Sequence, residues 1–386
     1  MTSIREFIRQ RLGPVEPLPP GTFHYQAPPD APLPYRLHLR IEPGGHGILI
    51  INASTVLHLN PTAAEFAYHL VGGTPPEQAA SEIAARYRIS RAQARHDLND
   101  FIERIRTLIE TPDLDPVMYL DFDRQAPYSQ SISAPYRLDC ALTYRLPPGV
   151  NPELAPTKRV ERQLTTDEWK TILDKAWQVG IPHIIFTGGE PTLRDDLPDL
   201  ISHTEANGQV SGLLTDGVRL AQPDYLDAIL KTGLDHIVLN LQPDNLQVAA
   251  ALKNTLSADI HLTVHLTLRP ENVARLSWTV EKLAQMGIGS LSLCATDAGL
   301  IGPLEALRNH AASLGLSLVW DLPVPYGAFN PVTLETAEDQ PPAGAGKAWL
   351  YVEPDGDVLP AQGMADRILG NMLRDPWEVI WQNCSH

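Results

Sequence analysis

Strand-like and helix-like segments alternate six times between Tyr136 and about residue 320, and this repeat constrains the fold more than any other feature. The predicted strands lie near 137–144, 182–187, 209–215, 235–241, 259–267 and 289–294. The predicted helices lie near 166–179, 195–206, 222–232, 244–254, 271–286 and 302–314. Strands and helices at this spacing pair the strands in parallel through right-handed crossovers. The sequence therefore predicts an α/β domain, and strand spacing alone leaves open whether it is a partial barrel or a doubly wound sheet.

The N-terminal part of the chain has a different pattern. Residues 1–35 are rich in proline, which excludes helix over 12–35 and predicts a linker or an extended arm. Short strands are predicted at 36–41, 47–51 and 56–59. A helix follows with Asn60 as N-cap and Pro61 at its first position. Two amphipathic helices are predicted next, at 75–87 and, after the cap Ser90, at 91–109.

Bulk composition excludes several classes of partner. The formal net charge is −16, which argues against non-specific nucleic-acid binding and against an anionic membrane surface. No transmembrane run and no signal peptide are apparent. The three cysteines, Cys140, Cys294 and Cys384, are far apart and predict neither a disulfide framework nor a metal site. We expect two of these thiols to be buried, the one near the C-terminus to be exposed, and the protein to be cytoplasmic.

The first predicted strand of the α/β domain, Leu138–Arg145, resembles the first barrel strand of radical S-adenosylmethionine (SAM) enzymes. In that family a Cys-x3-Cys-x2-Cys loop follows and holds a [4Fe–4S] cluster through its thiolates. The corresponding positions here are Leu146, Val150 and Glu153. The run Thr187–Pro191, in contrast, matches the family's SAM-binding strand end. The resemblance implies a partial (β/α)6 barrel over 136–320, without an iron–sulfur cluster.

The N-terminal module also resembles a known family. The junction His58–Glu65 between the short strands and the helices is similar to that of the PqqD-like domain, a small winged-helix module also called a RiPP recognition element. The resemblance covers residues 36–110 and implies recognition of a peptide. Residues 111–135 are rich in proline and aspartate and are predicted to be an interdomain linker.

The C-terminal segment 321–386 contains a predicted β-hairpin at Trp349–Pro360, turned at Asp355-Gly356. It resembles the SPASM or twitch extension that follows many peptide-modifying radical SAM barrels. Two of the auxiliary-cluster cysteines of that extension correspond to Ala343 and Ala361 here, so the resemblance implies loss of this cluster as well.

The candidate ligand-binding residues all lie at predicted strand ends. By resemblance, residues 188–191, at the end of the second predicted strand, would contact the methionine part of SAM. The alternative is a tight strand-to-helix turn with Glu190 near a helix start, where the helix dipole favours an anion. The ends of the third and fourth predicted strands add weaker candidates. Asn240 and Gln242, at the fourth, correspond to positions near the SAM ribose. Turn or strand-end structure is the alternative explanation for the residue types at both strand ends. The full set is Gly188, Gly189, Glu190, Pro191, Thr215, Asp216, Gly217, Asn240 and Gln242.

No spacing of carboxylates or imidazoles predicts a replacement metal site. His261 and His265 are four residues apart, but they lie in a predicted strand, where such residues are about 13 Å apart. Because iron chelation of SAM is also lost, SAM binding is expected to be weak or absent. If the site is a remnant, Glu190→Ala is expected to change stability little.

Two functions of different classes remain. The first is a degenerate radical SAM-like scaffold that binds a precursor peptide, or a peptide-modifying partner enzyme, by strand addition. The peptide groove is predicted to lie between Gly47–Ile51 and the helix 91–109. The second is an enzyme that uses the barrel for cluster-independent or non-radical SAM chemistry. A pocket lined by titratable groups with shifted pKa values would favour the enzyme, and a plugged barrel mouth would favour the scaffold.

Overall fold

A computed structural model describes residues 15–28, 30–111, 114, 119, 132–148, 160, 162–241, 246–319, 322 and 344–384. The chain divides into two compact units, Met1–Gln125 and Ala126–His386. No helix within the described ranges is both long enough and apolar enough to cross a membrane.

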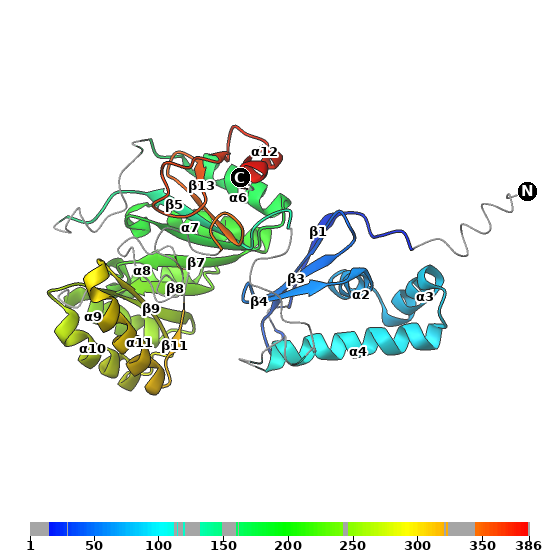
Figure 1. The fold of residues 1–386 in the computed structure, drawn as a ribbon, viewed down its shortest axis with the longest axis horizontal. Coiled ribbons are helices and arrows are strands. Elements are labelled where there is room, and N and C mark those ends of the chain that lie inside the picture. The colour runs from blue at the N-terminus through cyan, green and yellow to red at the C-terminus, as the bar shows by residue number, and fades with distance from the viewer. Residues whose placement is uncertain are drawn as a thin grey trace, which may run out of the picture. The chain divides into compact units, whose positions relative to one another are not determined.

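The first unit is built on a four-stranded antiparallel sheet in chain order (Figure 1). Its strands are β1 (Gly21–Gln26), β2 (Arg36–Ile41), β3 (Gly47–Ile51) and β4 (Thr55–Leu59). The last three confirm the predicted strands. β1 lies in the segment predicted to be a linker or an extended arm, and it pairs with β2 along its whole length.

The position of β3 contradicts one prediction. Strand addition needs a strand with free main-chain groups, and the groove was predicted beside Gly47–Ile51. β3 is paired with β2 on one side and with β4 on the other, so its main chain is already occupied. In the described sheet, β4 is the edge strand on this side, and a peptide added there would lie one strand further out.

Three helices follow the sheet, as predicted: α2 (Pro61–Val71), α3 (Pro76–Tyr87) and α4 (Arg91–Glu110). Asn60 caps α2 by accepting a hydrogen bond from the Ala63 amide, and Ser90 caps α4 through the Gln93 amide. Apolar residues of α2 and α4 pack on one face of the sheet, against Leu39, Leu49 and Leu57 among others. A second apolar cluster joins α2, α3 and α4 through Phe66, Ile83 and Leu98. This unit therefore has its own core.

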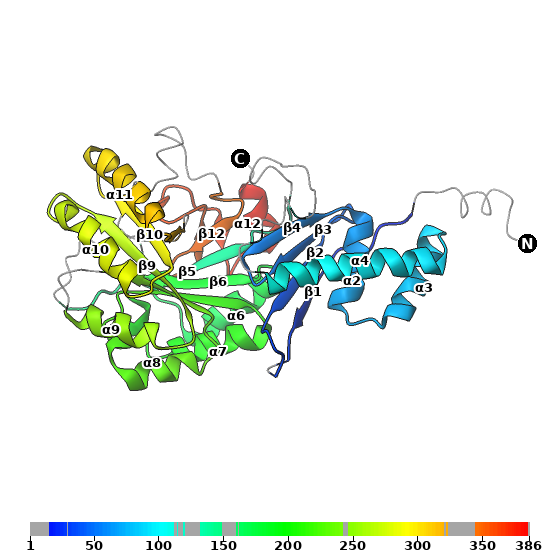
Figure 2. The ribbon, with the colours of Figure 1, turned by 90° about the horizontal axis from the view of Figure 1, so that it is seen from below.

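The second unit contains a ten-stranded sheet in the order β11-β10-β9-β8-β7-β6-β5-β12-β13-β14 (Figures 1 and 2). Its strands are β5 (Arg137–Thr143), β6 (His183–Gly188), β7 (Val210–Thr215), β8 (His236–Asn240), β9 (His261–Leu268), β10 (Ser290–Ala295), β11 (Ser317–Leu318), β12 (Trp349–Val352), β13 (Asp357–Leu359) and β14 (Gly370–Asn371). The helices between or after them are α6 (Thr166–Gln178), η2 (Pro191–Leu193), α7 (Leu197–Asn207), η3 (Arg219–Ala221), α8 (Pro223–Leu230), α9 (Leu246–Leu256), α10 (Val273–Gln285), η4 (Ala298–Leu300), α11 (Ile301–Ser313) and α12 (Trp377–Asn383).

The strand order decides between the two predicted architectures. β5 to β10 are parallel and adjacent in chain order. A doubly wound sheet reverses its order at a switch point, whereas a barrel continues in one direction. The sheet is thus of the partial (β/α)6 barrel type, and its six strands and six main helices lie close to the predicted ranges.

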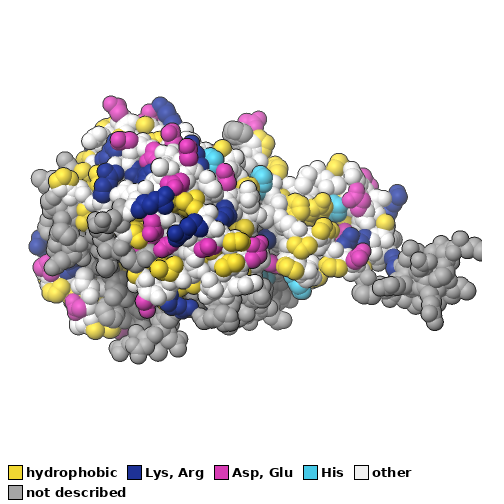
Figure 3. All heavy atoms as spheres, turned by 90° about the horizontal axis from the view of Figure 1, so that it is seen from above, with side chains coloured by type: hydrophobic (Ala, Val, Ile, Leu, Met, Phe, Trp, Pro, Cys, Tyr) yellow, Lys and Arg dark blue, Asp and Glu magenta, His cyan; other side chains and the backbone are white. Residues whose placement is uncertain are grey.

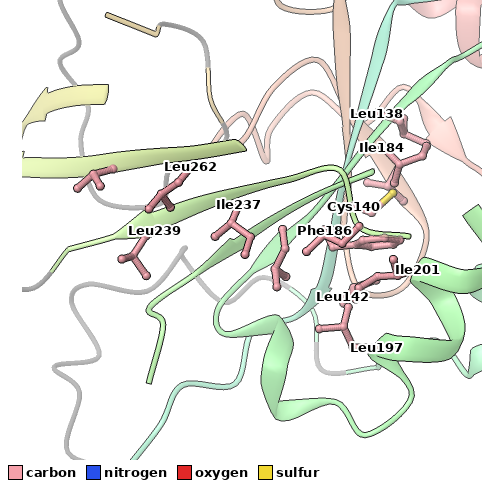
Figure 4. Packing of buried hydrophobic residues seen from close by; sticks show 14 of the residues in the cluster. Leu138, Cys140, Leu142, Ile184, Phe186, Leu197, Ile201, Ile237, Leu239 and Leu262 are labelled. Carbon is pink, nitrogen blue, oxygen red and sulfur yellow. The ribbon is translucent and has the colours of Figure 1, made fainter. Parts of the chain in front are cut away.

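Alternate residues of these strands form the main core on the helix-covered face of the sheet (Figure 4). Leu138, Cys140 and Leu142 of β5 lie beside Ile184 and Phe186 of β6, and α7 contributes Leu197 and Ile201. The intervening strand residues face the other side of the sheet, and this inner face is richer in polar side chains.

The predicted C-terminal hairpin is present. β12 and β13 pair antiparallel, with the turn at Asp355-Gly356, where Gly356 has a φ of 90°. The sequence did not predict that β12 also pairs in parallel with β5, from Trp349 beside Arg137 to Val352 beside Cys140. The C-terminal segment therefore extends the barrel sheet beyond its first strand.

Candidate functional site

The sequence-predicted residues meet where β6 and β7 end. Ligands in parallel α/β proteins bind at the carboxyl ends of the strands, so this is the position that a binding site would occupy. β6 ends at Gly188 and leads through Glu190 into the short helix η2, while β7 ends at Thr215, next to Asp216.

The side chain of Glu190 accepts most of the hydrogen bonds at this strand end. Its side chain Oε1 accepts hydrogen bonds from the Thr192 amide (3.0 Å), the Thr192 hydroxyl (2.6 Å) and the Thr215 hydroxyl (2.7 Å). Its Oε2 accepts from the Asp216 amide at 2.7 Å. The main-chain amide of Glu190 donates to the Arg145 carbonyl oxygen, after the end of β5. Glu190 thus links the ends of β5, β6 and β7 and also caps η2, as the turn interpretation predicted.

The two glycines accommodate the protein's own main chain. A Cβ atom on Gly188 would lie 2.3 Å from the Thr143 carbonyl oxygen, and one on Gly189 would lie 2.2 Å from that of Arg145. Gly188 also has a φ of 118°, which side chains other than glycine rarely adopt. Both glycines therefore pack against the end of β5 and the residues that follow it.

Glu190 and Asp216 form a coupled pair of buried carboxyl groups. Burial, followed by the charge of Asp216, raises the pKa of Glu190 to about 8. Burial also raises the pKa of Asp216, although hydrogen bonds from the Val218 amide and from the Glu190 side chain oppose the rise. Burial therefore disfavours the charged form of both carboxyl groups, and a charge on one raises the cost of ionising the other.

Three arginines in the turns that follow these strands are engaged with other partners. Arg145 donates to the Leu193 carbonyl oxygen, Arg219 to that of Thr192, and Arg194 pairs with Asp196. No ion pair among the described residues joins a cation to Glu190 or to Asp216. Tyr225, whose ring lies 4.0 Å from the Arg219 guanidinium carbon, completes the surroundings; burial raises its pKa to about 12.

The remaining predicted residues are only partly joined to this centre. Pro191 begins η2, and the Gly217 amide donates to the Thr215 hydroxyl at 3.1 Å. Asn240 is buried at the end of β8, and no hydrogen bond among the described residues connects it to Glu190 or Asp216. Gln242 lies outside the described residues.

Two of the five positions that correspond to cluster cysteines in the family lie within the described residues. Leu146 is half-buried after β5, and Ala361 is buried after β13, whereas Val150, Glu153 and Ala343 lie outside the described residues. Cys140 is in the helix-side core, and Cys294 is on the opposite face of the sheet. Cys384 was expected to be exposed; it is half-buried because it packs against the core from the end of α12.

These thiols do not converge. Within the described part of the chain, no group of three or more His, Cys, Asp or Glu residues is placed to hold a metal ion. Since a [4Fe–4S] cluster needs several thiolates around one point, the described residues do not fit such a cluster.

The inner face of β9 and β10 carries a second buried polar group. The ring of His265 contacts the hydroxyls of Ser292 (3.0 Å) and Thr267 (3.1 Å) and the Cys294 sulfur (3.3 Å). Burial lowers the pKa of His265 to about 3 and raises that of Cys294 to about 12. The His265 ring is therefore neutral at neutral pH, and the Cys294 thiol stays protonated, which makes it a poor nucleophile. His261 and His265 are strand residues, as predicted.

Thr192 was not predicted from the sequence, although it donates two of the four bonds to Glu190. The local signal was the run Glu190-Pro191-Thr192, since a carboxylate two residues before an amide at a helix start is a capping pattern.

Charged side chains of both signs lie together on the surface of the molecule. On the face shown in Figure 3, Lys and Arg are interspersed with Asp and Glu, so the net charge of −16 is not segregated there.

Comparisons with known proteins agree with both halves of this architecture. Residues 140–290 match the family model of the radical SAM superfamily, and residues 45–108 match that of coenzyme PQQ synthesis protein D (PqqD). A PqqA peptide cyclase of Streptomyces rochei is 29% identical over 291 residues, which cover 65% of this chain and 76% of the relative. Another from Xanthomonas axonopodis pv. citri (strain 306) is 29% identical over 259 residues, covering 58% and 67%.

Solved structures add a likeness of fold. Streptococcus suis SuiB bound to S-adenosylmethionine has a TM-score of 0.60 at 15% identity and covers 89% of this chain and 86% of its own. SuiB bound to the precursor peptide SuiA has a TM-score of 0.58 at 14% identity, with the same coverage of 89% and 86%.

Proposed function

We propose that this chain, a radical SAM protein with an N-terminal PqqD domain, binds the precursor peptide of a peptide-modification pathway and acts as a scaffold without [4Fe–4S] chemistry. The observation that carries the proposal is the combination of a sheet whose edge strand β4 pairs only with β3 among the described strands and a barrel whose described residues do not fit a cluster. Relatives named PqqA peptide cyclase and the peptide-bound structure of SuiB support the peptide as partner.

Peptide binding is assigned to the first unit, and specifically to the outer edge of β4. Among the described residues β4 pairs only with β3, so its other edge can form main-chain hydrogen bonds with an added strand. The neighbouring strands and α2 hold β4 in place, because Leu57 and Leu59 are buried in the core of the unit. A rigid edge lowers the entropy cost of ordering a peptide beside it.

The test is titration of the full chain with precursor peptides encoded near its gene, followed by the same titration with the unit Met1–Gln125 after circular dichroism has verified its fold. Equal affinity in both is expected. Peptides N-methylated at alternate residues should lose binding in one of the two alternation patterns only, because a strand uses every second amide for pairing. Binding that requires residues 126–386, or that tolerates both methylation patterns, would contradict the proposal.

A second candidate function is favoured by the coupled carboxyl pair. Titratable groups with strongly shifted pKa values at a strand end are typical of active sites, so cluster-independent chemistry on a peptide is the alternative. SAM affinity separates the two: we expect it to be weak at neutral pH. Calorimetry that gave a low-micromolar dissociation constant for SAM at pH 7, abolished by Glu190→Ala, would favour the enzyme.

A further inference from the structure

We propose that His183 and His236 form a two-imidazole site for a transition-metal ion such as Zn²⁺ at the amino ends of β6 and β8. This is the end of the sheet opposite to the strand ends that hold Glu190. The inference goes beyond peptide binding by the first unit and does not rest on it.

The two rings meet across the strand that separates them. β7 lies between β6 and β8 in the sheet, so these side chains can touch only if β7 leaves room. Gly212 of β7 leaves that room: a Cβ atom there would lie 2.1 Å from His236 Cε1 and 2.3 Å from its Nε2. The two Nε2 atoms are 2.8 Å apart, the ring centroids are 5.0 Å apart, and the ring planes are inclined at 64°. Spacing in the sequence could not show this pair, because the two histidines are 53 residues apart.

The facing nitrogens suit a metal ion as well as a proton. In the structure a hydrogen bond joins them, in which one ring donates and the other accepts. Neutral imidazole is a common ligand of zinc, copper and nickel ions. Zn–N bonds of about 2.0–2.1 Å in a tetrahedral site place two nitrogens about 3.3 Å apart, so a small rotation of either ring makes room for the ion. Both rings are half-buried, and since no three potential ligands converge within the described residues, water would fill the remaining coordination positions.

The surroundings of the pair keep one ring neutral and tolerate a cation. Burial, followed by the charges of His261 and Arg137, lowers the pKa of His236 to about 4, so protons do not compete for this ring at neutral pH. Arg137 is next to His183 in the strand register, but its guanidinium already forms an ion pair with Asp139 at 2.7 Å. The carboxylate offsets the repulsion that the arginine alone would exert on a metal ion.

The experiment uses the full chain without an affinity tag and Zn²⁺ alone as the probe. Calorimetric titration at pH 7 in a buffer that does not bind metals gives the stoichiometry and the affinity. His183→Gln and His236→Gln should each lower the affinity at least about tenfold, because a chelate of two ligands binds far more tightly than either ligand alone. Gly212→Ala keeps both histidines but fills the space of the His236 ring, so it should cause a similar loss.

His261→Gln is the matched control, because His261 is exposed and lies in register with His236 on the neighbouring strand. It should bind Zn²⁺ as tightly as the wild type. Tryptophan fluorescence of each variant verifies that the second unit is folded, since all seven Trp residues lie within 126–386.

Electron paramagnetic resonance with Cu²⁺ gives a second readout that does not need every variant to fold. The wild type should show two coordinated imidazoles, and a spectrum with one imidazole would overturn the inference. Equal Zn²⁺ affinity in the wild type and in folded His236→Gln would overturn it too. A loss in His261→Gln as large as that in His236→Gln would do the same, because the ion would then belong to a surface histidine. None of these results would bear on peptide binding by the first unit.

Discussion

At the scale of single residues, Glu190 contributes more to the structure than the sequence predicted. A remnant of a lost ligand site was expected to tolerate Glu190→Ala with little change in stability. The four hydrogen bonds to its carboxyl group change that expectation. Two of the donors are main-chain amides, and a buried amide without a partner costs about 1–3 kcal/mol.

Glu190→Ala should therefore lower the free energy of unfolding of the second unit by about 2–4 kcal/mol. The measurement is urea denaturation at pH 6, followed by tryptophan fluorescence, which reports on this unit alone. Asp195→Ala, at an exposed position nearby, should stay within about 0.5 kcal/mol of the wild type. An effect of Glu190→Ala as small as that of the control would show that these bonds are not formed.

The same carboxyl group makes stability depend on pH. The pKa of Glu190 is raised from 4.5 to about 8 in the folded protein, so the folded state keeps a proton that the unfolded chain releases above its own lower pKa. The resulting stabilisation is complete below about pH 4.5 and is lost as the pH rises towards 8.

Asp216→Asn removes the neighbouring charge that contributes to this shift. The difference in free energy of unfolding between Asp216→Asn and the wild type should therefore grow in favour of the variant from pH 5 to pH 8. Urea midpoints measured across this range test the prediction. Parallel curves for the two proteins would mean that the carboxyl groups titrate independently.

At the scale of secondary-structure elements, helix starts are set by local signals that the sequence displays. Thr165 and Glu168 form a reciprocal capping box at the start of α6. Thr165→Ala should lower the free energy of unfolding by about 1 kcal/mol. Thr165→Ser keeps the hydroxyl oxygen and should be close to neutral, so the two variants separate loss of the cap from loss of the methyl group in the same denaturation assay.

Elements defined by local patterns were predicted well for the same reason. Asn60 and Ser90 begin the helices that they were expected to cap, and the strands of the barrel follow apolar runs that are visible in the sequence. β1 was missed because prolines on both sides obscure its short alternation, in which Phe23 and Tyr25 face the core. The parallel pairing of β12 with β5 joins segments about 200 residues apart, and no local pattern encodes such a contact.

The candidate site was also predicted only as far as local patterns reach. Its residues were located because strand ends carry glycine, threonine and carboxylate side chains in a recognisable order. The direction in which the Glu190 side chain points depends on Thr215, which comes from the next strand. A single sequence fixes neither that contact nor the burial of Glu190 beside Asp216.

At the scale of the whole molecule, the placement of the cysteines predicts that no iron–sulfur cluster will assemble. Cys140 and Cys294 are buried on opposite faces of one sheet, and Cys384 is near the end of α12. After anaerobic incubation with iron and sulfide, the purified protein should show neither stoichiometric bound iron nor the visible absorption of a cluster. A protein that holds a [4Fe–4S] cluster, treated in parallel, is the positive control, and a cluster in this protein would remove the basis of the scaffold proposal.

The pairing of β12 with β5 also has a consequence for how the protein is made. β5 is synthesised long before β12, so during translation one side of the first barrel strand has no partner strand. An unpaired strand edge is a template for association with other chains. The sheet of the second unit is therefore completed only after β12 has left the ribosome, and a truncation before Trp349 would leave the edge of β5 free to pair with other chains.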